Sequence, residues 1–269
     1  MERDSRAQVP VGFRAEVEVA LRDGAPGDLR LLAFEAATFD WQQDGLRLND
    51  DAQARLSGAT HSIAVPGEPP SRVVLFTGHM VDAADRPPEK ARFPRTAQAE
   101  ARARAMIKAA VERELHGHAE SFLGMAGAAC GGDILFHEVC ADLGAKTDIY
   151  LLMPPDEFEA ASVQPGGPGW VERFRALLLR STPRVLQTSA ALPDWLADKP
   201  EYNAWERNNL WMMFNAIAIA TGAGDLALIA LFNREREASG PGGTGHLVAE
   251  AAKQGFRPTV LDARELLAG

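Results

Sequence analysis

The chain has 269 residues, of which 46% are hydrophobic and 24% are charged, and its formal net charge is -9. A chain of this length can bury a large hydrophobic core, but an acidic chain lacks the basic surface with which proteins bind nucleic acids or anionic membranes. With only Cys130 and Cys140, no CxxC motif and no apolar run long enough to span a bilayer, the sequence indicates a soluble, cytoplasmic protein, for which we expect no metal, no cofactor, no nucleic-acid partner and no membrane partner.

Residues 1–70 are interpreted as a small N-terminal extension. The segments "FRAEVEVALRDG" and "LRLLAFEAATFDW" fit either short strands or helices. The stretch "PGEPPS", from Pro66 to Ser71, is typical of a linker because its prolines remove hydrogen-bond donors and block helix formation. We expect the extension to pack on a main domain that spans residues 71–269.

The main domain alternates apolar, strand-like runs with helical patterns. The apolar runs lie at Val73–Phe76, Ser121–Ala126, Asp148–Met153, Arg184–Thr188, Leu226–Phe232 and Pro258–Asp262. The helical patterns lie at Thr96–His116, Ile134–Leu143, Gly169–Arg180, Asn203–Ala220 and Gly243–Gln254. Because strands that are apolar throughout belong to sheets covered on both faces, the pattern predicts an α/β fold with a doubly wound, Rossmann-like parallel sheet and helices on both faces.

The first strand leads into "TGHMVDAADRPPEKARFPR", and ligands of open parallel sheets bind beyond the carboxyl ends of the strands. The loop from residue 79 to 94 is long for a compact domain, which is typical of a functional loop or lid. Its arginines can close over an anion, although solvation is the commoner role of a single surface arginine. The ligand-binding candidates of this segment are Thr77, Gly78, His79, Met80, Asp82 and Arg92.

The second strand is followed by "GMAGAACGGDILFHEVCADLGA", whose glycines leave the backbone uncovered just before a helix. The sequence leaves two roles open for Asp133, which either caps the helix or accepts a hydrogen bond from a ribose hydroxyl or an amine. Cys130 is either a packing residue or a weakly reactive thiol. The ligand-binding candidates here are Gly127, Cys130, Gly131, Gly132 and Asp133.

The predicted helix "EYNAWERNNLWMMFNAIAIATG" carries polar residues within an otherwise apolar pattern. Asn208, Met212 and Asn215 share one face of this helix. Since buried amides must be paired, they either tie the helix to neighbouring backbone or face a ligand. Asn208 is our ligand-binding candidate of this helix.

The stretch "GPGGTGHLVAEAAKQGF" places a glycine-rich turn directly before an amphipathic helix. Such a turn presents backbone N–H groups and the positive end of the helix dipole, and its usual occupant is a phosphate. A plain loop built from turn-forming residues is the alternative. The candidates for the phosphate contact are Gly242, Gly243, Thr244 and Gly245.

Together, "FTGHM", "AGAACGGDILFHE" and "GPGGTGH" resemble the corresponding motifs of the SLOG superfamily over about Arg72 to Asp262. This superfamily joins the Lonely Guy phosphoribohydrolases, the DNA-processing proteins of natural transformation, and sensor domains of bacterial signalling and defence. The resemblance implies a nucleotide or nucleotide-derived ligand bound across the two glycine turns. The sensor-type members resemble the chain most, and the acidic charge weighs against the DNA-processing type. A homo-oligomer or an effector protein as partner stays open.

The sequence departs from the phosphoribohydrolase motif where the resemblance would place catalysis. In those enzymes "PGGxGT" leads into acidic residues, whereas Val248 and Ala249 occupy these positions here and Glu250 is one residue out of phase, a rotation of about 100° on a helix. We therefore expect binding without turnover. The alternative, an N-glycosidase acting on nucleoside monophosphates, needs a carboxylate against the sugar, for which the candidates are Asp133, Glu138 and Glu250.

Overall fold

The computed structural model of the protein describes residues 11–38, 69–117, 119–197, 199, 202–220, 225–233 and 242–267. Its centre is a 6-stranded sheet with the strand order β4-β3-β2-β1-β5-β6, and every pairing in it is parallel. The strands are β1 (Arg72–Gly78), β2 (Phe122–Ala126), β3 (Lys146–Leu151), β4 (Arg184–Val185), β5 (Leu226–Phe232) and β6 (Thr259–Asp262). The predicted Rossmann-like parallel sheet is confirmed.

The central strands β1, β2 and β5 are mostly apolar because helices cover both faces of the sheet. In β1, Val74 and Phe76 belong to one hydrophobic core, and Val73 and Leu75 belong to the other. This division follows the period of two residues with which side chains alternate along a strand.

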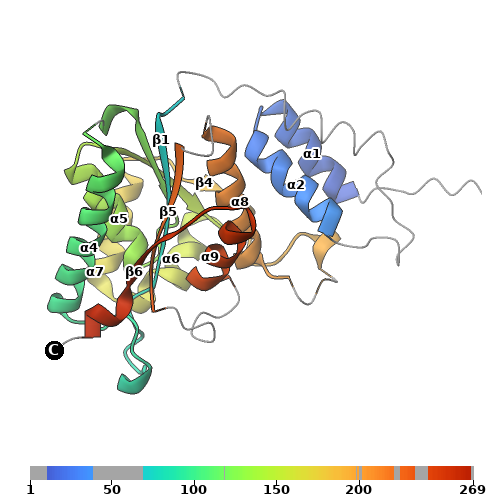
Figure 1. Cartoon of the computed structure of the whole chain (residues 1–269). Coiled ribbons are helices and arrows are strands. Elements are labelled where there is room, and N and C mark those ends of the chain that lie inside the picture. Colours follow the sequence, from blue (N-terminus) through green and yellow to red (C-terminus); the bar gives the residue numbers. More distant parts are fainter. Residues whose placement is uncertain are drawn as a thin grey trace, which may run out of the picture.

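The helices lie in two layers, one on each side of the sheet (Figure 1). On one side, α4 (Ala97–Leu115), α5 (Gly132–Asp142) and α7 (Pro168–Leu178) contribute to the core of Val74. On the other side, α8 (Ala204–Ile219) and α9 (Thr244–Lys253) contribute to the core of Val73. Among the described residues, the other helical segments of the main domain are α6 (Pro155–Ser162), which the sequence pattern did not predict, and the 3-10 turns η2 (Pro88–Lys90), η3 (Ala119–Ser121), η4 (Gln164–Gly166), η5 (Asp194–Leu196) and η7 (Ala263–Leu267).

The described part of the N-terminal extension consists of two helices, α1 (Val11–Arg22) and α2 (Pro26–Thr38), which settles the choice that the sequence left open. Helix α2 packs against α8. A Cβ atom on Gly27 would lie 2.4 Å from the side chain of Asn215, so only glycine permits this approach of the two helices. The other expected parts of the extension, residues 1–10 and 39–68 with most of the linker, lie outside the described residues.

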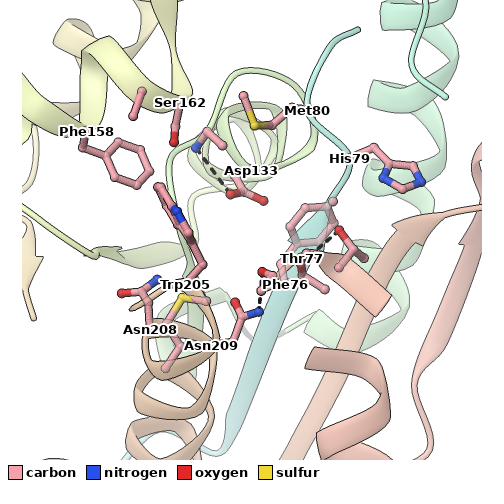
Figure 2. A pocket seen from close by; sticks show the side chains of 18 of the residues that line it. Phe76, Thr77, His79, Met80, Asp133, Phe158, Ser162, Trp205, Asn208 and Asn209 are labelled. Atoms are coloured by element: carbon pink, nitrogen blue, oxygen red, sulfur yellow. Dashed lines mark hydrogen bonds between the residues drawn. The ribbon is translucent and has the colours of Figure 1, made fainter. Parts of the chain in front are cut away.

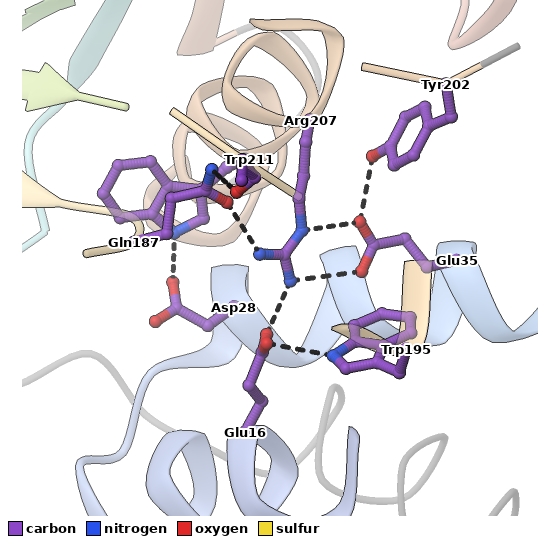
Figure 3. A network of polar contacts seen from close by, with 9 residues as sticks. Glu16, Asp28, Glu35, Gln187, Trp195, Tyr202, Arg207 and Trp211 are labelled. Carbon is purple, nitrogen blue, oxygen red and sulfur yellow. Dashed lines mark hydrogen bonds and ion pairs between the residues drawn. The ribbon is translucent and has the colours of Figure 1, made fainter. Parts of the chain in front are cut away.

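A buried ionic network also anchors α8 to the N-terminal helices (Figure 3). The guanidinium of Arg207 on α8 contacts Glu35 of α2 at 2.9 Å and Glu16 of α1 at 2.5 Å. The Tyr202 hydroxyl donates a hydrogen bond to Glu35 at 2.9 Å, and the Trp195 indole donates one to Glu16 at 3.0 Å. These contacts fix the position of the helix that carries several of the site residues described below.

The order of the strands creates a natural ligand site between β1 and β5. The chain leaves β1 toward α4 on one side of the sheet and leaves β5 toward α9 on the other side (Figure 1). The connections therefore separate at this point, and the crevice between them is where open α/β sheets bind ligands. Within the described residues, no helix has the length and apolar character needed to cross a membrane.

Candidate functional site

A cleft of about 400 Å³ lies at this crevice, beyond the carboxyl end of β1 and beside the N-terminus of α9 (Figure 2). It brings together the predicted residues of all four sequence segments. The predicted residues that line it are Thr77, Gly78, His79, Met80, Arg92, Gly127, Asp133, Asn208, Gly242, Gly243 and Thr244.

Three glycines allow the end of β1 to approach the start of α5 closely. A Cβ atom on Gly78 would lie 2.9 Å from the Cα atom of Gly132, and one on Gly131 would lie 2.6 Å from the carbonyl oxygen of His79. Gly131 also has a φ of +118°, which other residues rarely adopt. Gly131 and Gly132 do not line the cleft themselves, but this close approach positions the residues that do.

Asp133 is the one carboxylate among the described residues that line the cleft. Its Oδ2 atom accepts a hydrogen bond from the backbone N–H of Ala129 at 3.4 Å, and a Cβ atom on Gly127 would lie 2.8 Å from the same oxygen. Burial raises the pKa of Asp133 to about 7, although backbone hydrogen bonds from Ala129 and Gly78 act in the opposite direction. The side chain is therefore shared between its neutral and its ionised form at neutral pH.

His79 is a neutral, fixed wall of the cleft. Its Nε2 atom lies 3.1 Å from Oδ1 of Asn233 at the end of β5. Burial lowers the pKa of His79 to about 4, and the nearby guanidinium of Arg92 adds to this effect. The imidazole is therefore uncharged at neutral pH, and the positive charge at this side of the cleft belongs to Arg92.

Asp82, a predicted ligand contact, does not line the cleft and instead organises the loop that follows β1. Its Oδ2 atom accepts hydrogen bonds from the backbone N–H groups of Arg92 and Phe93, both at 2.9 Å. Its Oδ1 atom lies 2.9 Å from Nε of Arg86. The carboxylate thus joins the two ends of the loop and holds Arg92 at the cleft, whereas closure of this loop over a ligand stays a prediction.

Helices α6 and α8 supply an aromatic and amide wall. Trp205 points from α8 into the cleft (Figure 2), and its ring centroid lies 6.1 Å from that of Phe158 on α6. Asn208 and Asn209 follow on the next part of α8, and Met212 lies one turn beyond Asn208. This wall combines a flat apolar surface with two side-chain amides, which suits a planar, polar ring.

The adjoining wall is the glycine turn at the start of α9. Gly242 has a φ of +77°, and a Cβ atom there would lie 2.2 Å from Trp205. The Nδ2 atom of Asn209 donates a hydrogen bond to the Gly242 carbonyl at 2.7 Å and ties the turn to α8. Gly243 is the N-cap residue of α9, and within the described residues no side chain caps this helix, which leaves its first N–H groups available to an anion. Gly240 and Pro241 of the predicted turn lie outside the described residues.

Four further candidates lie outside the lining of the cleft. Cys130 is buried, and burial raises the pKa of its thiol to about 11, which agrees with a packing role. Gly245 lies inside the first turn of α9. Glu138 is held by Arg104 at 2.8 Å and Arg173 at 2.6 Å, and Glu250 contacts Lys253 at 2.5 Å.

The sequence reasoning missed a part of the wall that comes from residues resembling ordinary core residues. Asn209 and Trp205 lie close to the candidate Asn208 on α8, so their position on this helix is a signal by which they could be predicted. No comparable signal marked the residues that come from α6. The missed lining residues are Phe76, Ala129, Phe158, Ala161, Ser162, Trp205, Asn209 and Met212.

The amide of Asn215 has a structural role. It donates hydrogen bonds to Asp28 at 3.2 Å and to the Trp211 carbonyl at 2.9 Å.

Among the described residues, no group of three or more His, Cys, Asp or Glu side chains is arranged to hold a metal ion. No protein-family model matches the chain, and comparisons with curated proteins and with solved structures find no match.

Proposed function

We propose that the cleft binds a nucleotide or a nucleotide-derived small molecule, and that the protein acts as a sensor of this ligand in bacterial signalling or defence, in line with its resemblance to the sensor-type SLOG proteins. The observation that carries the binding proposal is the uncapped, glycine-rich N-terminus of α9 at the crevice between β1 and β5. A sensor of this kind acts through an effector protein or through a second copy of itself.

The lining of the cleft suits both parts of a nucleotide. The first N–H groups of α9 and the guanidinium of Arg92 each favour an anion such as a phosphate. The indole of Trp205 and the ring of Phe158 favour a flat heterocycle. The volume of about 400 Å³ falls in the range of small-molecule sites.

Replacing Gly243 tests the anion site. Its φ of -75° and ψ of 179° suit any residue, so the Gly243→Val substitution adds a branched side chain to the turn without backbone strain. We expect the affinity for AMP, measured by calorimetry, to fall about tenfold or more, which corresponds to about 1.4 kcal/mol. Gly169→Val is the matched control, because a Cβ atom at Gly169 meets nothing within 4 Å and Gly169 lies outside the cleft. Equal AMP affinities of both variants, with the fold intact, would place the anion elsewhere.

The second candidate function is a nucleoside monophosphate phosphoribohydrolase, and the position of Asp133 favours it. A carboxyl group with a pKa of about 7 in a cleft can transfer a proton or stabilise the positive charge that develops on the sugar. Incubation with AMP separates the two functions. The sensor releases free base no faster than its Asp133→Asn variant, whereas a turnover of about 1 per second that disappears in this variant would establish the enzyme.

A further inference from the structure

Among the side-chain amides of α8, that of Asn208 is the one that makes no hydrogen bond to the described residues. Its Oδ1 atom is buried and accepts no hydrogen bond from any of the described residues, although the residue is only 5% exposed. The other asparagines of α8 and its N-cap are bound: Asn203 caps the helix, Asn209 binds the Gly242 carbonyl, and Asn215 binds Asp28 and the Trp211 carbonyl. Asn208 therefore differs from its neighbours in having an unused amide.

An unused amide at this position has a free-energy cost, because buried polar groups are almost always paired. Asn208 lines the cleft, so rotation of its side chain would bring the buried Oδ1 atom to a ligand seated there. The sequence left open whether Asn208 ties α8 to neighbouring backbone or faces a ligand. The unpartnered Oδ1 atom favours the ligand.

The chemistry of the amide decides which part of the ligand it meets. A phosphate only accepts hydrogen bonds, so it repels the amide oxygen and is better served by the N–H groups of α9 and by Arg92. An amide offers a donor and an acceptor side by side, and rotation about its last torsion exchanges them. Its natural complement is a flat ring edge on which a donor lies next to an acceptor, as on a nucleobase.

Trp205 supplies the surface on which such a ring would lie. It precedes Asn208 by about one helical turn on α8, so the two side chains share one side of the helix, and both line the cleft. A heterocycle stacked on the indole directs its edge, not its face, toward side chains beside the indole. Stacking is tolerant of ring identity, whereas hydrogen bonds to the edge are selective.

We propose that Asn208 is a specificity-determining residue, which recognises the hydrogen-bonding edge of a heterocycle stacked on Trp205. This inference rests on the proposed nucleotide-binding function and names the part of the ligand that the cleft selects. It also implies that α8 recognises the ring while the turn before α9 holds the anion.

Ribose 5-phosphate provides the discriminating comparison, because it carries the phosphate and the sugar without a ring. Calorimetry with AMP, CMP, GMP, UMP and ribose 5-phosphate first measures how much tighter the wild-type protein binds a nucleotide than the ring-free compound. We expect about tenfold or more for at least one nucleotide, because a site built for hydrogen bonds rejects a compound that lacks them. The Asn208→Ala variant should lose most of this preference and keep its affinity for ribose 5-phosphate.

Asn215→Ala is the matched control, since it removes a structural amide from the same helix outside the cleft. Asn215→Ala should lower the midpoint of urea unfolding and retain the preference for the nucleotide. Asn208→Ala should lose this preference without a lower midpoint. An equal loss of affinity for nucleotide and ribose 5-phosphate in Asn208→Ala, or no loss, would overturn the inference.

The wild-type protein alone distinguishes the remaining outcomes. If it binds ribose 5-phosphate as tightly as every nucleotide, the inference fails while the anion site stands. If it binds none of the five compounds, the proposed function fails and the inference fails with it.

Discussion

Asp133 is subject to two opposing effects. It lies in the first turn of α5, where the helix dipole stabilises a carboxylate, yet burial raises its pKa to about 7. The hydrogen bond from Ala129 comes from the loop before α5, and the N-cap residue of this helix is Gly131, which has no side-chain cap. Of the two roles that the sequence left open, the helix cap is therefore not observed, whereas the position beside the cleft is compatible with a ligand contact.

The raised pKa makes a prediction for stability. Because the folded pKa of about 7 exceeds the ordinary value of 3.8 for an aspartate, the contribution of Asp133 is fully present below the lower value and is lost as the pH rises through 7. Asp133→Asn keeps the acceptor oxygen and removes the titration. We expect the free energy of unfolding of this variant, relative to the wild type, to increase by about 1–2 kcal/mol between pH 5 and pH 8, after allowance for water in the cleft.

Urea unfolding at the two pH values measures this difference. Asp156→Asn is a suitable control, because Asp156 also lies in the first turn of a helix, α6, but is exposed. The relative stability of the control should be the same at both pH values. A constant difference between Asp133→Asn and the wild type would show that the carboxyl group is ionised throughout this range.

At the scale of the elements, Glu138 joins three helices and takes no part in the cleft. Its carboxylate on α5 contacts Arg104 of α4 and Arg173 of α7, and Arg173 also contacts Glu100 of α4 at 2.8 Å. Burial alone would raise the pKa of Glu138, but the two guanidinium groups hold it below its ordinary value. A carboxylate held in this way is a poor general base and a good structural contact.

Glu138→Gln is therefore predicted to affect stability and not ligand binding. Loss of the half-buried ion pairs should lower the free energy of unfolding by about 1–2 kcal/mol, whereas the AMP affinity stays unchanged. The control is Glu112→Gln, whose exposed contact with Lys108 at 3.7 Å should contribute less than about 0.5 kcal/mol. Urea unfolding and calorimetry give the two quantities. Loss of AMP binding in a stable Glu138→Gln protein would return Glu138 to the list of site residues.

The length and burial of an element determine whether it can be predicted from the sequence. All six strands overlap the apolar runs. The signal is strong in β1 and β5, which are buried along most of their length, and weak in β4, which has two residues and is not buried. Helix α6 has only 8 residues and begins at a proline, so it carries too few turns for a clear period. In α1 and α2 the apolar residues fit both periods, and the packing of α2 on α8, which the sequence cannot display, decides the outcome.

Some residues of the candidate site could likewise be predicted from the sequence and others could not. Glycine turns have a local signature, and the turns at Gly78, Gly131 and Gly242 could be recognised from the chain alone. Trp205 and Phe158 lack such a signature, since an aromatic residue that lines a cleft has the same pattern as one in the core. The carboxylates of Glu138 and Glu250 could be named as candidates, but their ion-pair partners belong to the tertiary structure.

At the scale of the whole molecule, the N-terminal helices and the main domain share one hydrophobic core and one ionic network. Leu29 and Leu32 of α2 pack in the same core as Leu210 of α8. The network centres on Arg207, which is 1% exposed, and Glu35, which is fully buried (Figure 3). Because Arg207 directly precedes Asn208 on α8, the contacts of α1 and α2 also determine where the cleft residues of this helix lie.

This arrangement predicts strong coupling between Arg207 and Glu35. Arg207→Met leaves Glu35 buried without its partner, and removal of one member of a buried pair costs about 3–5 kcal/mol. In Glu35→Met it is the guanidinium that loses a partner, although Glu16 remains beside it. The double variant removes both charges, so neither remains buried without its partner. We therefore expect its loss of stability to be smaller than the sum of the two single losses by about 1–3 kcal/mol in urea unfolding.

The pH dependence provides the sharper test of this coupling. Burial raises the pKa of Glu35 to about 7 from its ordinary value of 4.5, and the guanidinium of Arg207 opposes this rise. A folded pKa above the unfolded one means that stability is lost as the pH rises through the folded value. Without Arg207 the folded pKa rises further, so the deficit of Arg207→Met should be larger at pH 8 than at pH 5. The double variant and Glu35→Met both lack the carboxyl group at position 35, so the difference in stability between these two variants should be the same at pH 5 and pH 8. A deficit of Arg207→Met relative to the wild type that is equal at both pH values would show that Glu35 does not depend on Arg207 for its charge.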